Sequence, residues 1–290
     1  MFHGSMVALV TPLLSDGSLD FASLDRLIAW HIEQGTRAII VAGTTGEAAT
    51  LEWQEKQSLI RRAVKVAEEK IPIIAGTAAN STKATIELTK MAMEEGVDAC
   101  LIMTPAYIKP TQEGLYQHYK AVAHAVAIPQ ILYNVPGRTA CDLLPETVAR
   151  LADIANIIGI KEATGDLSRV REIKNRCTGV FDLYSGDDPS ALDFMRLGGK
   201  GVISVTANVA PHLMSQMCEA LLAQQFEVAN EIDQRLMPLH RALFVEANPI
   251  PTKWALHHMQ LIEAGIRLPL TELSEQHQPR LRQLLQGLSE

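Results

Sequence analysis

Short apolar segments alternate with longer amphipathic segments from the N-terminus to about residue 205. Residues 6–11 read Met-Val-Ala-Leu-Val-Thr, and residues 38–42 read Ala-Ile-Ile-Val-Ala. Continuous apolar runs of this length are typical of strands that are buried on both faces of a parallel sheet. The pattern predicts eight strands, at residues 6–11, 38–42, 72–75, 100–103, 130–134, 157–161, 181–185 and 202–205.

The segments between these strands have helical patterns with recognisable ends. Asp20 is a candidate N-cap for the first helix, and Gly35 ends it. Eight strand–helix units in about 220 residues are the number and size of a (β/α)8 TIM barrel. We therefore predict an α/β protein of this class. Its first seven helices are expected near residues 21–34, 53–69, 82–95, 112–126, 145–151, 167–176 and 189–197.

A doubly wound open sheet is the alternative arrangement for alternating strands and helices. The first strand is not followed by a G-x-G-x-x-G motif, which such nucleotide-binding sheets carry at this point. A P-loop is also missing, because Gly199-Lys200 is followed by Gly201 rather than by Ser or Thr. These observations favour the barrel.

Only helical patterns follow residue 208, at 211–223, 226–245 and 249–262. A barrel needs one of them as its eighth helix, so the others form a small extension. We expect a catalytic barrel domain at residues 1–225 and a C-terminal all-helical domain at residues 226–290. Such an appendage offers a natural surface for self-association.

Composition and charge exclude several classes of protein. The chain has 26 Lys and Arg against 33 Asp and Glu, a net charge of −7, so we expect no binding to nucleic acid or to anionic membranes. No apolar stretch is long enough to span a membrane, and no secretory signal is visible. The 4 cysteines and 9 histidines lack metal-site spacing. We expect a cytoplasmic protein with reduced thiols and no metal.

The most informative residue is Lys161, which ends the apolar strand Ile-Ile-Gly-Ile-Lys. A buried lysine is desolvated, which lowers its pKa and produces the neutral amine that attacks carbonyl groups. Taken alone, the pattern also fits an ordinary lysine whose ammonium group extends from a strand end into water. The neighbouring strand ends decide between the two.

Other polar residues lie where the predicted strands end, which is the catalytic face of a barrel. Tyr133 beside Lys161 is a candidate proton shuttle, and the Thr44 hydroxyl could link it to a second phenol, Tyr107. Arg138 offers a planar fork for a carboxylate, and the Gly43–Gly46 loop offers backbone N–H groups near Thr45. Ordinary interpretations exist: a tyrosine can simply pack, and Arg138 can lie on the surface. Gly186-Asp187-Asp188 is more typical of a turn with an N-cap than of a metal site.

Several motifs together closely resemble the dihydrodipicolinate synthase family, within the pyruvate-dependent class I aldolase/lyase superfamily. The resemblance covers essentially the whole chain. The arginine in Tyr-Asn-x-Pro-x-Arg-Thr is typical of this family and absent from the sialic-acid lyases. The matching motifs are Gly43-Thr44-Thr45-Gly46-Glu47, Tyr133-Asn134-Val135-Pro136-Gly137-Arg138-Thr139, Gly159-Ile160-Lys161-Glu162-Ala163, Ser185-Gly186-Asp187-Asp188 and Gly201-Val202-Ile203-Ser204-Val205-Thr206.

The resemblance implies a lyase that condenses pyruvate with L-aspartate 4-semialdehyde, in the diaminopimelate route to lysine. Lys161 would form a Schiff base with pyruvate, and Tyr133 would transfer protons through Thr44 to Tyr107 of a neighbouring subunit. The family is usually a homotetramer built as a dimer of dimers, and no organic cofactor is implied. The residues implied to bind the substrates are Thr45, Gly186 and the Ile203 backbone, with Arg138 on the carboxylate of the semialdehyde.

The chain departs from the family at the site where regulated members bind lysine. Those members use histidines, an asparagine, a glutamate and a tyrosine, and only the asparagine is kept. A lysine ammonium group would lack its counter-charge here. We therefore predict weak or absent inhibition by L-lysine. The matching positions are Trp53, Lys56, Asn80, Ala84 and Ala106.

Two other functions also fit the sequence. One is a pyruvate lyase that cleaves sialic acid or a 2-keto-3-deoxy sugar acid, which would share Lys161 and Tyr133 but would not need Arg138. The other is a non-catalytic barrel that binds small carboxylates, in which Lys161 is only an anchor.

Overall fold

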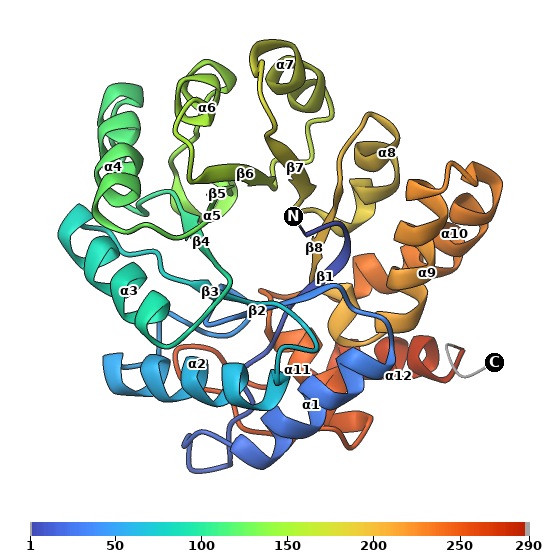
Figure 1. Cartoon of the computed structure of the whole chain (residues 1–290). Helices are drawn as coiled ribbons and strands as arrows, with labels where there is room; N and C mark the ends of the chain where they lie inside the picture. Colours follow the sequence, from blue (N-terminus) through green and yellow to red (C-terminus); the bar gives the residue numbers. More distant parts are fainter. Residues whose placement is uncertain (1, 288–290) are drawn as a thin grey trace.

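The eight strands within residues 2–287, the part of the chain that the computed structural model describes, pair in sequence order as a closed parallel barrel (Figure 1). Closure is made by β1 and β8, where Gly4 lies opposite Gly201. The predicted barrel is confirmed, with strand ends shifted by a few residues. The strands are β1 (Gly4–Ala8), β2 (Ala38–Val41), β3 (Ile73–Gly76), β4 (Ala99–Met103), β5 (Gln130–Asn134), β6 (Ile157–Glu162), β7 (Asp182–Ser185) and β8 (Gly201–Ser204).

Helices between the strands form the outer ring seen in Figure 1, except the short α5, which lies beside β5. Their starts are encoded locally: the side chains of Asp20, Ser81 and Thr111 accept hydrogen bonds from backbone N–H groups in the first turns of α1, α3 and α4. The helices are α1 (Phe21–Glu33), α2 (Trp53–Ala67), α3 (Thr82–Glu94), α4 (Gln112–Ala125), α5 (Pro136–Thr139), α6 (Pro145–Ala152), α7 (Ser168–Arg176) and α8 (Ala191–Arg196).

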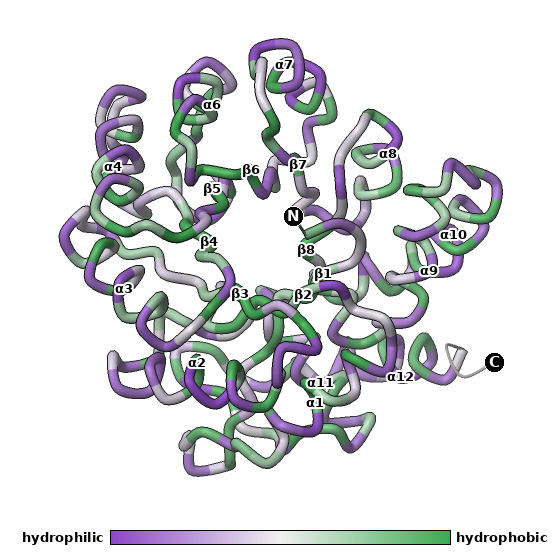
Figure 2. The backbone as a smooth tube through the Cα atoms, in the orientation of Figure 1, coloured by the Kyte–Doolittle hydropathy of each residue, from purple (hydrophilic) through white to green (hydrophobic). Residues whose placement is uncertain are grey.

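The core has two parts, because successive residues of a strand point to opposite faces. Val7 of β1 packs outward in the layer between strands and helices, whereas Met6 points into the barrel. Figure 2 shows this arrangement as apolar strands inside a ring of helices with polar outer faces. Tyr133 and Ile203 belong to the inner group, so the ends of β5 and β8 present side chains to the barrel interior.

The remaining helices are α9 (Pro211–Leu222), α10 (Phe226–Ala242), α11 (Ile250–His258) and α12 (Gln278–Gln286). Helices α10 and α11 end earlier than predicted, and α12 was not predicted, because its sequence is short and mostly polar. Leu236, Leu256 and Leu281 of these helices pack into the same apolar layer as the outer face of the barrel. The division into domains at residues 225 and 226 stays a prediction.

Candidate active site

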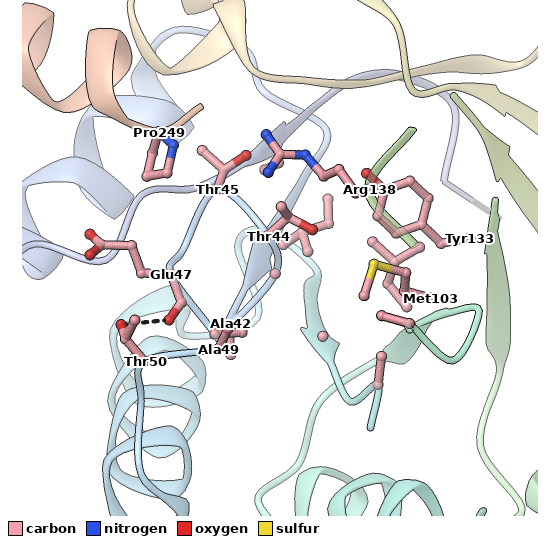
Figure 3. A pocket seen from close by; sticks show the side chains of 18 of the residues that line it. Ala42, Thr44, Thr45, Glu47, Ala49, Thr50, Met103, Tyr133, Arg138 and Pro249 are labelled. Atoms are coloured by element: carbon pink, nitrogen blue, oxygen red, sulfur yellow. Dashed lines mark hydrogen bonds between the residues drawn. The ribbon is translucent and has the colours of Figure 1, made fainter. Parts of the chain in front are cut away.

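A cavity of about 630 Å³ opens at the carboxyl ends of the strands. Five of the residues expected at the site line it: Thr44, Thr45, Tyr133, Arg138 and Lys161. Figure 3 shows the side chains of the first four around this space. Residues separated by more than a hundred positions in the chain therefore meet at one place, as expected for the catalytic face of a barrel.

Lys161 lies near the end of β6, opposite Tyr133 on β5 and Tyr184 on β7. Only 4% of the residue is exposed, and its Nζ lies 4.4 Å from the centre of the Tyr133 ring. Burial lowers the pKa of Lys161 from 10.5 to about 8, with the negative charge of Asp188 opposing the decrease and Arg138 adding to it. At pH 7 about a tenth of such a lysine is neutral, against well under a thousandth at the ordinary pKa.

Tyr133 is buried beside this amine. Burial raises the pKa of its phenol, while the positive charge of Arg138 and a hydrogen bond with the Thr44 hydroxyl lower it. The phenol therefore carries its proton near neutral pH, and it can give that proton to a leaving hydroxide and recover it later.

The loop after β2 holds Thr44 and Thr45 in a tight turn. Ala42 and Glu47 have left-handed backbones, each with a φ of 53°. Within the turn, the N–H of Glu47 donates to the Thr44 carbonyl at 3.1 Å. The Thr45 hydroxyl accepts a hydrogen bond of 2.9 Å from Nδ2 of Asn248. The loop thus presents two threonine hydroxyls at fixed positions beside the cavity.

Arg138 belongs to the short helix α5, which follows β5 directly. Its Nη2 donates to the main-chain carbonyl of Asn248 at 3.0 Å. In Figure 3 the guanidinium extends across the cavity toward Thr45, so a carboxylate between them would meet both a cation and a hydroxyl.

Gly186 and Ile203, two more expected site residues, are not among the residues that line this cavity. A Cβ atom at Gly186 would be 2.9 Å from Cε of Lys161, so glycine leaves the space that the lysine side chain occupies. Ile203 is buried in β8, with its side chain inside the barrel.

Tyr107 is the expected site residue that the structure places elsewhere. It lies in the loop after β4, is 87% exposed and has a left-handed backbone with a φ of 72°. Its main-chain N–H donates to the Thr139 carbonyl at 3.1 Å, but its ring is not part of the cavity wall within one subunit. Its expected role depends on a second copy of the chain and stays a prediction.

A buried group of polar residues lies at the wall of the cavity, beside the β2 loop. Lys253 of α11 donates to Oε1 of Glu47 at 2.5 Å, and the two side chains are 4% and 0% exposed. The other carboxylate oxygen, Oε2, accepts a bond from the main-chain N–H of Arg267 at 3.2 Å. Asn248, which donates to the Thr45 hydroxyl, lines the cavity, as does Glu47. Of this group, only Glu47 belongs to a motif quoted above.

Glu162, next to Lys161, is a further buried carboxyl group. It accepts hydrogen bonds from Nδ2 of Asn134 at 3.0 Å and from the N–H of Thr164 at 2.8 Å. Burial raises the pKa of Glu162, and these hydrogen bonds oppose the increase. Because Asn134 follows Tyr133, the contact ties the ends of β5 and β6 together.

Among residues 2–287, no cluster of three or more His, Cys, Asp or Glu side chains could hold a metal ion. Within the same residues, no helix is both long and apolar enough to cross a membrane. Cys100, Cys141, Cys177 and Cys218 are free thiols.

Known proteins match this chain over its full length. The model of the dihydrodipicolinate synthetase family matches residues 1–288. A 4-hydroxy-tetrahydrodipicolinate synthase of Alcanivorax borkumensis is 60% identical over 285 residues, which are 98% of this chain and 97% of that protein. The chain belongs to the dihydrodipicolinate synthetase family.

Two solved structures show how closely the fold follows this family. The chloride-inhibited dihydrodipicolinate synthase of Acinetobacter baumannii, complexed with pyruvate, has a TM-score of 0.98 and 54% identity, covering 100% of this chain and 99% of that one. The enzyme of Cyanidioschyzon merolae with lysine bound has a TM-score of 0.96 and 40% identity, covering 99% and 98%. Barrel and C-terminal helices are thus both part of the family's fold.

Three of the positions connected above with lysine inhibition, Lys56, Asn80 and Ala106, line the same cavity. Burial lowers the pKa of Lys56. The side-chain oxygen of Asn80 accepts a hydrogen bond from the N–H of Ala106 at 3.1 Å. In this member of the family, an ammonium ligand at these residues would meet a cation.

Proposed function

We propose that the protein is a 4-hydroxy-tetrahydrodipicolinate synthase that binds pyruvate as a Schiff base on Lys161 and condenses it with L-aspartate 4-semialdehyde. The observation that carries the proposal is the buried amine of Lys161, with its pKa lowered to about 8, in contact with the Tyr133 ring in a cavity. Burial without a directly bonded carboxylate is what a nucleophilic lysine requires.

In the first step, the neutral amine of Lys161 attacks the keto carbon of pyruvate. The carbon–oxygen double bond is replaced by a carbon–nitrogen double bond, and the oxygen leaves as water with the two protons that the amine gives up. Tyr133 is the group placed to transfer them, through the Thr44 hydroxyl on its other side. Thr45 and the backbone at Ile203 hold the carboxylate of pyruvate, and Gly186 leaves room for the adduct.

In the second step, loss of a proton from the pyruvate methyl group gives an enamine, whose carbon attacks the aldehyde carbon of the semialdehyde, and the aldehyde oxygen takes up a proton to become a hydroxyl group. The amino group of the semialdehyde then attacks the imine carbon, which closes the ring and releases the amine of Lys161. Arg138 binds the carboxylate of this second substrate, because its guanidinium offers two parallel donors at the cavity. Sugar-acid lyases share the first step but have no need of Arg138.

The proposal includes a homotetramer built as a dimer of dimers, in which Tyr107 of one subunit completes the proton relay of its neighbour. The exposed Tyr107 and Ile108 side chains, 87% and 54% accessible, support a contact at this loop. We also propose a cytoplasmic location, for which the free thiols are suited.

Reduction with borohydride in the presence of pyruvate tests the Schiff base. The proposal expects Lys161 to gain the mass of pyruvic acid less one oxygen atom, because the imine forms with loss of water and is then reduced. An unmodified Lys161 under these conditions would favour the non-catalytic carboxylate-binding barrel.

Turnover of L-aspartate 4-semialdehyde, compared with sialic acid and 2-keto-3-deoxy sugar acids, tests the second substrate. We expect Arg138→Ala to lower kcat/KM for the semialdehyde by about 10- to 100-fold, the cost of a lost hydrogen bond to a charged group. Pyruvate trapping at Lys161 should persist in this variant. Efficient sugar-acid cleavage would instead identify a sugar-acid lyase.

A further inference from the structure

The C-terminal segment reaches the cavity at one residue, Asn248, which contacts two substrate-binding groups at once. Its Nδ2 donates to the Thr45 hydroxyl at 2.9 Å, and its carbonyl accepts from Nη2 of Arg138 at 3.0 Å. The residue is 5% exposed. One residue outside the barrel strands therefore links the groups proposed here for the two carboxylates.

The direction of the Thr45 hydrogen bond has a chemical consequence. A hydroxyl group has one proton to donate and two lone pairs that accept. Because Asn248 donates to the oxygen, the hydroxyl proton cannot point toward Asn248. It is left for an acceptor on another side, and the cavity, which Thr45 lines, lies there.

The amide of Asn248 is held in this orientation by its own neighbours. Its Oδ1 accepts a bond from the Thr252 hydroxyl at 3.3 Å, which leaves Nδ2 to face Thr45. In the first turn of α11, Lys253 forms the buried ion pair with Glu47 of the same loop as Thr45. The start of α11 and the β2 loop are thus joined at two points.

We propose that Asn248 is a positioning residue for pyruvate recognition, because its amide directs the Thr45 hydroxyl proton to the pyruvate carboxylate. The inference rests on the proposed function, since it assigns a further residue to the same site. Its carbonyl gives Arg138 a fixed place beside the same hydroxyl. Asn248 itself need not touch the substrate.

Replacing Asn248 by aspartate tests the direction of this bond with almost no change in shape. A carboxylate can only accept, so it takes the Thr45 proton and turns it away from pyruvate. We expect the pyruvate concentration for half-maximal borohydride trapping, and KM for pyruvate, to rise about 10- to 100-fold. Since Asn248 acts on recognition, kcat at saturating pyruvate should change by less than about threefold.

A matched control reports on the change in net charge alone, and Asn248→Ala, which adds no charge at the site, separates the hydrogen bond from repulsion of the pyruvate carboxylate. Asn175 is exposed on α7, so Asn175→Asp makes the same chemical change away from the site. This variant should keep the wild-type KM for pyruvate. Thermal unfolding of each variant reports whether the fold is intact, and Asn248→Ser, which adds no charge, replaces the aspartate variant if that one does not fold.

A double-mutant cycle shows whether Asn248 acts through Thr45. Thr45→Val removes the hydroxyl and keeps the shape of the side chain. If Asn248 works by orienting that hydroxyl, Asn248→Ala should raise KM for pyruvate in the wild-type background and leave it almost unchanged in the Thr45→Val background. A purely structural role predicts the same factor in both.

Equal effects of Asn248→Ala in both backgrounds, or a wild-type KM for pyruvate in Asn248→Asp, would overturn the inference while pyruvate still modifies Lys161 in the parent protein. If pyruvate does not modify Lys161 in the parent protein, the proposed function itself is wrong. The two failures are therefore distinguishable in one set of trapping experiments.

Discussion

Lys161 and Lys253 are two lysines buried to the same extent, each 4% exposed, at the same end of the barrel. Burial lowers the pKa of Lys253 as well, but the Glu47 carboxylate, 2.5 Å away, opposes that decrease. For Lys161 the corresponding carboxylate is Asp188, and its Oδ2 is bonded instead by the N–H groups of Val205 and Thr206, each at 2.9 Å.

The difference shows that burial alone does not make a lysine reactive. A directly bonded carboxylate keeps the amine protonated, and a protonated amine cannot attack a carbonyl group. Lys253 is therefore suited to hold two segments together. Lys161, desolvated and next to a phenol, is suited to chemistry.

Lys161→Met gives the largest expected effect. Without the amine no Schiff base can form, so activity should fall by at least about 1,000-fold, as when a covalent nucleophile is removed. At pH 7 the folded protein holds a cation whose pKa is lowered from 10.5 to about 8, which destabilises it. Removing that cation should raise the free energy of unfolding, by up to about 3 kcal/mol. Steady-state rates and chemical denaturation measure the two changes, and retained turnover would exclude Lys161 as the nucleophile.

Lys253→Met should have the opposite effects, a loss of stability with the reaction at Lys161 retained. It leaves the buried Glu47 carboxylate without its cation, so we expect a loss of about 3–5 kcal/mol in the free energy of unfolding. Pyruvate should still be trapped on Lys161 in the molecules that fold. The double variant Glu47→Gln/Lys253→Met removes both charges and should recover most of the lost stability. If the single variant is as stable as the parent, the ion pair has no structural role.

The pH dependence of imine formation tests the lowered pKa of Lys161. Because the neutral amine reacts and the pKa of Lys161 is about 8, the rate of trapping should rise about tenfold per pH unit below pH 8 and level off above it. The free energy of unfolding should also rise with pH. The folded chain loses this proton at a lower pH than the unfolded chain does, so the contribution of Lys161 to the free energy of unfolding rises between about pH 8 and 10.5. A midpoint near the ordinary lysine pKa would contradict the pKa assignment.

The smallest expected effect is that of added L-lysine. The positive charge of Lys56, together with Ala84 and Ala106 at two other positions, leaves no counter-charge for a lysine ammonium group. Initial rates should therefore be nearly unchanged at L-lysine concentrations that inhibit regulated relatives. An inhibition constant as low as theirs would show that the ligand is held by other residues.

The fold and the reactive residues were predictable for related reasons. Apolar strands can be recognised from short stretches of sequence, and barrel geometry then brings their ends together, which placed Tyr133 and Lys161 side by side. Asn248 and Lys253 could not be found in this way. Their partners Thr45 and Glu47 are 203 and 206 positions away, and no periodic pattern encodes such a contact. Tyr107 was correctly placed after the fourth strand, but its ring lies outside the cavity of its own subunit.

The bonds from Glu47 to Lys253 and Arg267 have a consequence for how the protein is made. All eight strands have been synthesised once residue 204 has been added, yet the carboxylate of Glu47 still lacks both partners at that stage. The loop that carries Thr45 thus acquires its final contacts only when residues 248–267 have left the ribosome.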